Sequence, residues 1–124
     1  MAPTPVLLAF GPRLFYESLV RELGSHEQVV PWISEASELP DLLVEVQRTQ
    51  AEAVIISTAT KADAAGIRSH LFSEFPHLSL LVLSAEDEIA FLYKQEVVVR
   101  RIPSVSVDAI LTALREGDTY WSPL

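Results

Sequence analysis

The chain has 124 residues and no cysteine, which excludes a disulfide framework, a thiolate metal site and a cysteine nucleophile. Its formal net charge of −8 disfavours direct binding to the phosphate backbone of a nucleic acid. Hydrophobic residues make up 49% of the chain, a composition typical of one globular domain. No apolar run is long enough to cross a membrane, and no basic leader precedes the first run. We therefore expect a cytoplasmic protein without a membrane partner.

The N-terminal half alternates short apolar runs with amphipathic stretches. Residues 6–10 are apolar and end at Gly11-Pro12, which is typical of a strand buried on both faces. A helix is predicted between Pro12 and Gly24, with a core-facing stripe of Leu14, Phe15, Ser18, Leu19 and Leu23. Residues 28–33 predict a second strand, and Pro31 places it at a sheet edge because proline cannot donate to a ladder. A second helix is predicted over residues 37–50.

The C-terminal half repeats this pattern. The predicted strands are residues 53–57, 78–84 and 97–102, and the predicted helices are residues 61–75, 86–94 and 107–116. The acidic run Glu86-Asp87-Glu88 is interpreted as the start of the helix over residues 86–94, where the helix dipole favours negative charge. A strand followed by a helix five times predicts a parallel sheet with helices on both faces. The expected fold is a single doubly wound (βα)5, flavodoxin-like α/β domain with five parallel strands in the order 2-1-3-4-5.

Three segments carry a resemblance to a known family. They are VLLAFGPRLFYESLVREL near the N-terminus, LLVLSA at the end of the fourth strand, and DAILTALREGDTYWSPL at the C-terminus. Together they resemble the receiver domains of LuxR/NarL-class response regulators, which are CheY-like, and the resemblance covers residues 1–124. Residues 117–124 are similar to the exit segment that leads, in that class, to a helix-turn-helix. Whether the chain is complete or cut from a longer DNA-binding regulator stays open.

The resemblance implies that the phosphorylation chemistry of a receiver is missing. The acidic pair that holds Mg²⁺ is matched by Phe10 and Gly11, which have no side-chain oxygen. The phosphoacceptor position is matched by Ser57, and the lysine that pairs with the phosphoryl group is matched by Ile102. Ser84 alone keeps the family's residue type, while Val99 matches the aromatic switch position. We expect no enzymatic activity, no cofactor and no metal.

The sequence alone leaves two interpretations open for Phe10 and for Ser57. Phe10 either plugs the vacated acidic pocket or belongs to the ordinary core. Ser57 is either a modified or ligand-binding hydroxyl or, more often for a strand-end serine, a partner of nearby backbone. The histidines, His26, His70 and His77, lack the spacing of a metal motif.

The function expected from this pattern is binding. The leading hypothesis is a phosphorylation-independent module of bacterial signal transduction or transcription control, acting by homodimerisation or by docking to another signalling protein. The candidate interface consists of the aromatic residues Trp32, Tyr120 and Trp121 together with Val99, Arg100 and Arg101 of the last predicted strand. The alternative is a sensory module that binds a small ligand in the vacated pocket.

Overall fold

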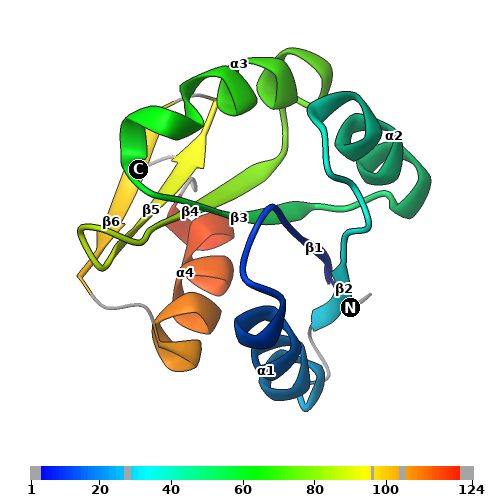
Figure 1. Cartoon of the computed structure of the whole chain (residues 1–124). Coiled ribbons are helices and arrows are strands. Elements are labelled where there is room, and N and C mark those ends of the chain that lie inside the picture. Colours follow the sequence, from blue (N-terminus) through cyan, green and yellow to red (C-terminus); the bar gives the residue numbers. More distant parts are fainter. Residues whose placement is uncertain (1–3, 27–28, 96, 104–105, 121–124) are drawn as a thin grey trace.

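The computed structural model describes residues 4–26, 29–95, 97–103 and 106–120, with backbone only for Arg100, Val107 and residues 115–120. The elements alternate strands and helices as far as β4 and then change pattern (Figure 1). In chain order they are β1 (Thr4–Ala9), α1 (Arg13–Gly24), β2 (Val29–Ile33), α2 (Leu39–Thr49), β3 (Ala53–Thr58), the 3₁₀ helix η1 (Lys61–Ala64), α3 (Ala65–Glu74), β4 (Ser79–Ser84), β5 (Ile89–Lys94), β6 (Val97–Ile102) and α4 (Val107–Tyr120).

The described strands form one mixed sheet in the order β2-β1-β3-β4-β5-β6. The first four of these pair in parallel, with Leu7 beside both Trp32 and Val54. This confirms the predicted α/β class, the order 2-1-3-4 and the position of β2, with Pro31, at the sheet edge. The prediction of five parallel strands is wrong, because β5 runs antiparallel to β4 and to β6.

The segment predicted as a helix over residues 86–94 is a turn followed by β5. Ala90 and Leu92 contribute to the core on one face of the sheet, whereas Tyr93 contributes to the core on the other. This alternation has the period of two that a strand requires. The interval from 85 to 96 is close to the shortest length, about a dozen residues, that a parallel crossover needs. Two reversals of direction fit into this interval, and the acidic run lies in the first of them.

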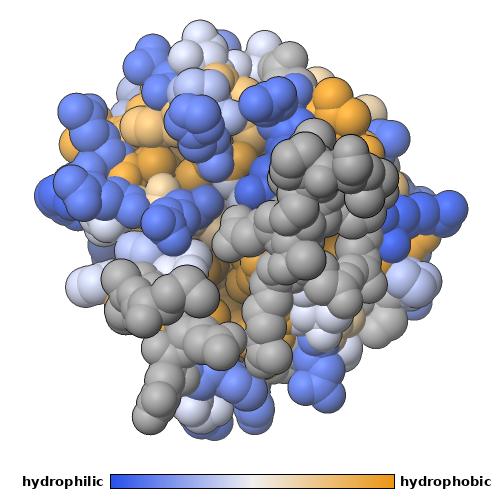
Figure 2. Space-filling model, turned by 180° about the vertical axis from the view of Figure 1, so that it is seen from behind, coloured by the Kyte–Doolittle hydropathy of each residue, from blue (hydrophilic) through white to orange (hydrophobic). Residues whose placement is uncertain are grey.

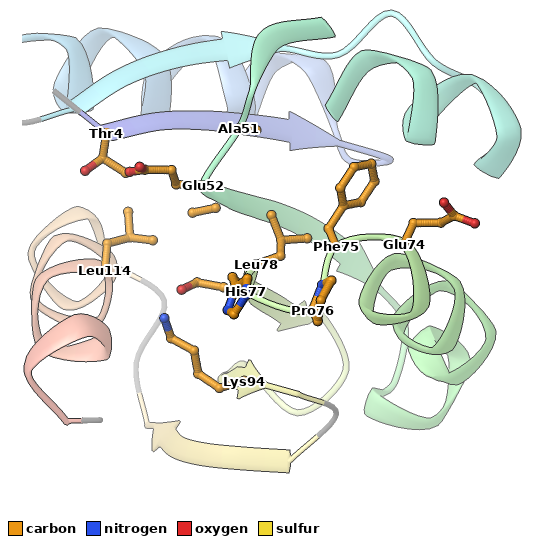
Figure 3. Close-up of a pocket in the computed structure, with 12 residues that line it drawn as sticks. Thr4, Ala51, Glu52, Glu74, Phe75, Pro76, His77, Leu78, Lys94 and Leu114 are labelled. Carbon is orange, nitrogen blue, oxygen red and sulfur yellow. The ribbon is translucent and has the colours of Figure 1, made fainter. Parts of the chain in front are cut away.

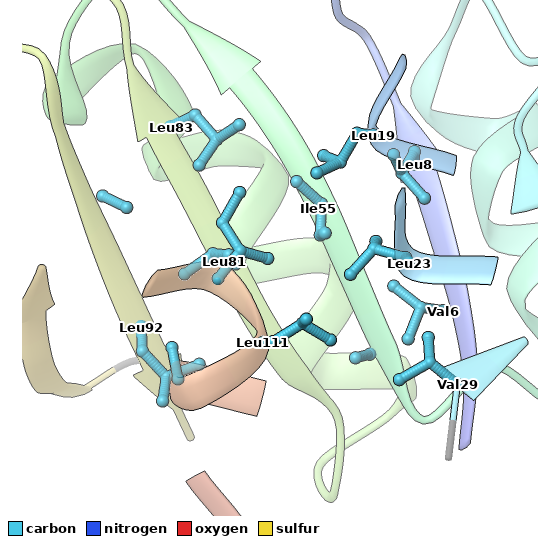
Figure 4. Close-up of a cluster of buried hydrophobic side chains, with 14 of the residues drawn as sticks. Val6, Leu8, Leu19, Leu23, Val29, Ile55, Leu81, Leu83, Leu92 and Leu111 are labelled. Carbon is cyan, nitrogen blue, oxygen red and sulfur yellow. The ribbon is translucent and has the colours of Figure 1, made fainter. Parts of the chain in front are cut away.

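Helices cover both faces of the sheet, as predicted. Figure 1 shows α2 and α3 on one side and α1 and α4 on the other. Figure 4 shows Leu19 and Leu23 of α1 and Leu111 of α4 packed against strand side chains in the core on the α1 and α4 side. The opposite core contains Leu42 of α2 and Leu71 of α3. The domain therefore has two apolar layers separated by a sheet whose central strands are buried on both faces.

The buried face of α1 differs from the predicted stripe. Tyr16, Leu19 and Leu23 are buried, whereas Leu14 is 83% exposed and Ser18 is also at the surface. The helix starts at Arg13 after Pro12, and this start sets which side of its first turn meets the sheet. Relative to the predicted stripe, the buried face of α1 is rotated by about one residue, which places Tyr16 and not Phe15 beneath the end of the sheet.

The described surface is mixed in character. Figure 2 shows hydrophobic residues reaching the surface in several separate places among hydrophilic ones. The exposed large apolar side chains include Trp32 on β2, Val44 on α2 and Val97 on β6. No helix within the described residues is long and apolar enough to cross a membrane.

Candidate functional site

The carboxyl ends of β1, β3 and β4 meet at one edge of the sheet, where two clefts lie side by side. We name them after the phenylalanine that lines each. The Phe15 cleft has a volume of about 470 Å³ and is lined by Pro12, Phe15, Ser57, Leu83, Ser84, Ala85, Glu88 and Pro103. The Phe10 cleft has a volume of about 520 Å³ and is lined by Phe10, Gly11, Pro12, Ala36, Ser37, Ser57, Thr58, Ala59 and Ala85. Ser57 lies on both, so it marks the boundary between them.

Tyr16 fills the space beneath Gly11. Its side chain is 1% exposed, and a Cβ built on Gly11 would lie 2.5 Å from the Tyr16 hydroxyl oxygen and 2.6 Å from Cε2. Those distances are far below van der Waals contact, so any side chain at position 11 conflicts with the tyrosine. An acidic residue at this position is therefore incompatible with Tyr16 as it is packed.

The Tyr16 hydroxyl joins the ends of β1 and β3. It donates to the Ala9 carbonyl at 2.8 Å and lies 3.1 Å from Ser57 Oγ. A phenol has one hydrogen, so with that hydrogen on Ala9 the Ser57 hydroxyl donates to Tyr16. The Ser57 oxygen then offers only lone pairs to the clefts. Burial raises the pKa of the Tyr16 phenol, and the hydrogen bond with Ser57 offsets part of that rise.

Ser84 and the adjacent backbone are also committed to internal bonds. Ser84 is 1% exposed, and its hydroxyl donates to Asp87 Oδ2 at 2.8 Å. The backbone N–H groups of Ala85 and Glu86 donate to the carbonyls of Thr58 and Ala59, each at 2.9 Å. These donors extend the ladder between β3 and β4 beyond the ends of the strands. Because the N–H groups of Ala85 and Glu86 already donate to these carbonyls, they are not available to bind an anion.

Phe10 packs on the side of the sheet opposite Tyr16. Its φ of 54° places it in the left-handed region, which few residues other than glycine adopt. Its half-buried ring packs against the core on the α2 and α3 side. The side chain that fills the space below Gly11 is therefore Tyr16, while Phe10 covers the edge of the core and lines one cleft.

Ile102 lies away from both clefts. It is 4% exposed, pairs with Ala90 across β5 and β6, and belongs to the core under α1 and α4. Pro103, the next residue, lines the Phe15 cleft in its place. Of the five predicted pocket residues, the structure groups Phe10, Gly11 and Ser57 in one cleft and Ser57 and Ser84 in the other.

The predicted interface residues are spread over the molecule. Trp32 is on β2 and is 51% exposed, whereas Arg100 and Arg101 are on β6 at the opposite edge of the sheet. Val99 is half-buried against the core on the α1 and α4 side. Tyr120 ends α4, and Trp121 lies outside the described residues. These residues therefore do not form one continuous surface.

A third pocket lies at the other end of the sheet. It has a volume of about 510 Å³ and is lined by Thr4, Ala51, Glu52, Ala53, Glu74, Phe75, Pro76, His77, Leu78, Ser79, Lys94 and Leu114 (Figure 3). Its charged side chains are of both signs, and Glu52, Glu74 and His77 are at the surface. It contains none of the predicted pocket or interface residues. Within the described part of the chain, no group of three or more histidine or acidic side chains is placed to hold a metal ion.

Comparison with known proteins adds no relative. The chain matches no protein-family model, and it has no significant match among curated proteins or solved structures. The site is therefore described by its own chemistry: the hydroxyl groups of Ser37, Ser57, Thr58 and Ser84, the carboxylate of Glu88, a buried phenol and apolar walls.

The most informative site residue, Tyr16, was not predicted from the sequence. The signal was present, because Tyr16, Leu19 and Leu23 have the i, i+3, i+7 spacing of a helix face. The predicted stripe was one residue out of phase and placed Tyr16 outside the core. Glu88 was also missed as a cleft residue, because it was assigned to a helix.

Proposed function

We propose that this chain is a cytoplasmic, receiver-like, CheY-like signalling module that acts through protein–protein contacts and without phosphoryl transfer. It would work in bacterial signal transduction or transcription control, by homodimerisation or by docking to another signalling protein. The observation that carries the proposal is Tyr16 packed beneath Gly11, at the position where a working receiver needs acidic side chains.

The chemistry of the clefts supports the absence of phosphoryl transfer. Transfer requires a nucleophile, a divalent cation and a fixed positive charge on the transferring group. Ser57 has no adjacent base, because its partner is a phenol whose pKa burial raises above the usual value. Among the residues that the structure describes, no lysine or arginine lines either cleft.

The arrangement of the first four strands supports the receiver-like class. The order β2-β1-β3-β4, with helices on both faces, is that of the flavodoxin-like folds. The departure is local, because β5 replaces the expected fourth helix and separates β4 from β6. The new edge strand β6 carries the features expected of a contact surface.

That surface, the β6 edge, consists of Val97, Val98 and Arg101. Val97 is 57% exposed and Val98 37%, and Arg101 is also exposed. Arg100 adds a second arginine to this strand, in a chain whose net charge is −8. Exposed valines on the edge strand of the described sheet favour addition of a strand from a partner, and Arg101 favours an acidic one.

Analytical ultracentrifugation over a concentration series tests the contact. We expect reversible association of the wild-type chain, or of the chain with a partner found by two-hybrid screening. Val98→Glu should weaken it about tenfold or more, because it places a charge on the apolar part of the edge. Val44→Glu is the matched control. Val44 is 62% exposed on α2, and this helix follows β2, the edge strand opposite β6. A chain that stays monomeric and has no partner sensitive to Val98→Glu would overturn the proposal.

A phosphoryl analogue tests the other half of the proposal. Beryllofluoride with Mg²⁺ should leave the ¹H–¹⁵N spectrum around Ser57 and Ser84 unchanged, since the clefts lack the ligands that hold both ions. Saturable shifts at Ser57, Thr58 and Ala85 would show a functioning acceptor site and refute the absence of phosphoryl transfer.

A further inference from the structure

We propose that the Phe15 cleft binds a small organic cation, an amine that carries an apolar body. This inference goes beyond the proposed contact function, since Val97, Val98 and Arg101 of the β6 edge do not line this cleft. It rests on three features: the apolar walls, the hydrogen-bonding groups that remain available, and the sign of the nearby charge.

The walls favour an apolar ligand body. Pro12 and Phe15 come from the start of α1, Leu83 from β4, and Pro103 follows β6. Phe15 is 37% exposed, so part of its ring is accessible from the cleft. An aromatic ring at the surface of a cleft offers both apolar contact and a face that attracts a cation.

The polar groups of the cleft accept hydrogen bonds. Ser57 gives its hydrogen to Tyr16, and Ser84 gives its hydrogen to Asp87, so neither hydroxyl donates into the cleft. The Ala85 N–H is bonded to Thr58. A ligand that brings its own N–H donors, such as an ammonium group, complements these acceptors.

The charge of the lining is negative. Glu88 is the one ionisable residue among the described side chains that line the Phe15 cleft, and Glu86 and Asp87 precede it in the same turn. Competing positive charge comes from the start of α1, whose partial charge favours an anion, and from Arg13 in its first turn, which pairs with Glu17 at 3.2 Å. A full carboxylate charge exceeds the roughly half charge of a helix end, and the acidic chain adds to its effect. The balance favours a cation.

The test compares two aromatic probes of similar size and opposite charge. The probes are phenethylammonium chloride and sodium phenylacetate, each titrated to about 20 mM at constant ionic strength and followed by ¹H–¹⁵N spectra. We expect saturable shifts at Ser57, Ala85 and Glu88 with the amine and none with the carboxylate. Ammonium chloride at the same concentration controls for the cation alone. Equal shifts with phenylacetate, or none with the amine, would overturn the inference.

Variants locate the binding. Glu88→Gln should weaken amine binding about threefold or more, and Phe15→Ala about fivefold, because they remove the charge and the aromatic wall respectively. Glu52→Gln is the matched control, since Glu52 is an exposed carboxylate on the pocket at the other end of the sheet. Glu88→Gln and Glu52→Gln with equal effects would show diffuse attraction to an acidic protein and refute a site. A failure here leaves the ultracentrifugation result for Val98→Glu unaffected, so the two proposals are tested separately.

Discussion

Gly11→Ala isolates the contact that defines the site. The added methyl would lie 2.5 Å from the Tyr16 hydroxyl oxygen and 2.6 Å from Cε2, and Tyr16 is fully buried with its hydroxyl bonded to Ala9. Gly11 has a negative φ, so the backbone itself accepts alanine and the effect is steric. Overpacking by one methyl group in a well-packed site costs about 1–3 kcal/mol of stability. We expect a loss of about 2 kcal/mol here, because the buried Tyr16 ring cannot move away from the methyl.

Urea unfolding followed by circular dichroism measures this cost as a lower midpoint at unchanged slope. A loss of about 2 kcal/mol corresponds to a fall in Tm of roughly 8 °C for a domain of this size. Gly66→Ala is the matched control, because a Cβ at Gly66, in α3, meets nothing within 4 Å. That substitution should stabilise the protein by about 0.5–1 kcal/mol through helix propensity.

A double-mutant cycle with Tyr16→Leu separates the tyrosine from other causes. Leucine is shorter than tyrosine and removes the ring atoms that approach Gly11, so Gly11→Ala should cost less than about 1 kcal/mol in that background. An equal cost in both backgrounds, or a wild-type midpoint for Gly11→Ala alone, would refute the packing argument. Gly11→Asp should be tolerated no better than Gly11→Ala unless Tyr16 is also replaced.

Three further substitutions have contrasting expected outcomes. Tyr16→Phe should cost about 1–2 kcal/mol, because the Ala9 carbonyl and Ser57 lose their buried partner. Tyr93→Phe should cost less than about 0.5 kcal/mol, because the equally buried Tyr93 hydroxyl has no hydrogen-bond partner among the described residues; a larger loss would indicate an ordered water. Burial raises the pKa of Tyr16, so the folded state keeps that proton longer and unfolding free energy should fall as pH rises above about 10. Tyr16→Phe should flatten this decline, and an unchanged slope would count against it. Leu92→Ala should cost about 2–4 kcal/mol, because Leu92 is 1% exposed in the core, whereas an exposed helical position would lose almost nothing.

The fold could be predicted from sequence as far as β4. Strands such as Ala53–Thr58 are short, β-branched and apolar, and few structures other than the central strand of a sheet bury such a run. The edge position of β2 also followed from a single residue, Pro31, whose missing N–H has a direct structural cost in a central strand.

Beyond β4 the prediction failed for a physical reason. The residues of β5, IAFLYK, are too few to distinguish the period of a helix from that of a strand. Their side chains alternate between the two cores, and this alternation can be recognised only when both faces of the sheet are known to be covered by helices. The family resemblance also favoured a helix there. The interval between Ser84 and Val97 is about as long as the shortest helical crossover, so its length did not reveal the change of strand direction.

The site was predicted only in position. The receiver resemblance matched Ser57, Ser84 and Gly11 to one pocket, and the structure places them on the two adjacent clefts at the carboxyl ends of the strands. The partner of Ser57 depended on the rotation of α1, which sequence spacing leaves uncertain by about one residue. Because that rotation decides whether Phe15 or Tyr16 faces the sheet, the chemistry of the site required the structure.

The replacement of a helix by β5 also changes how the sheet can assemble. β4, β5 and β6 follow one another in the chain and in space, so their pairing closes only short loops, such as that between Ser84 and Ile89. Pairing of β1 with β3 instead brings together residues as distant as Val6 and Ala53. The entropic cost of closure rises with loop length, and local contacts speed folding. The C-terminal meander is therefore expected to form first and to provide the edge on which β3, and then β1, is added.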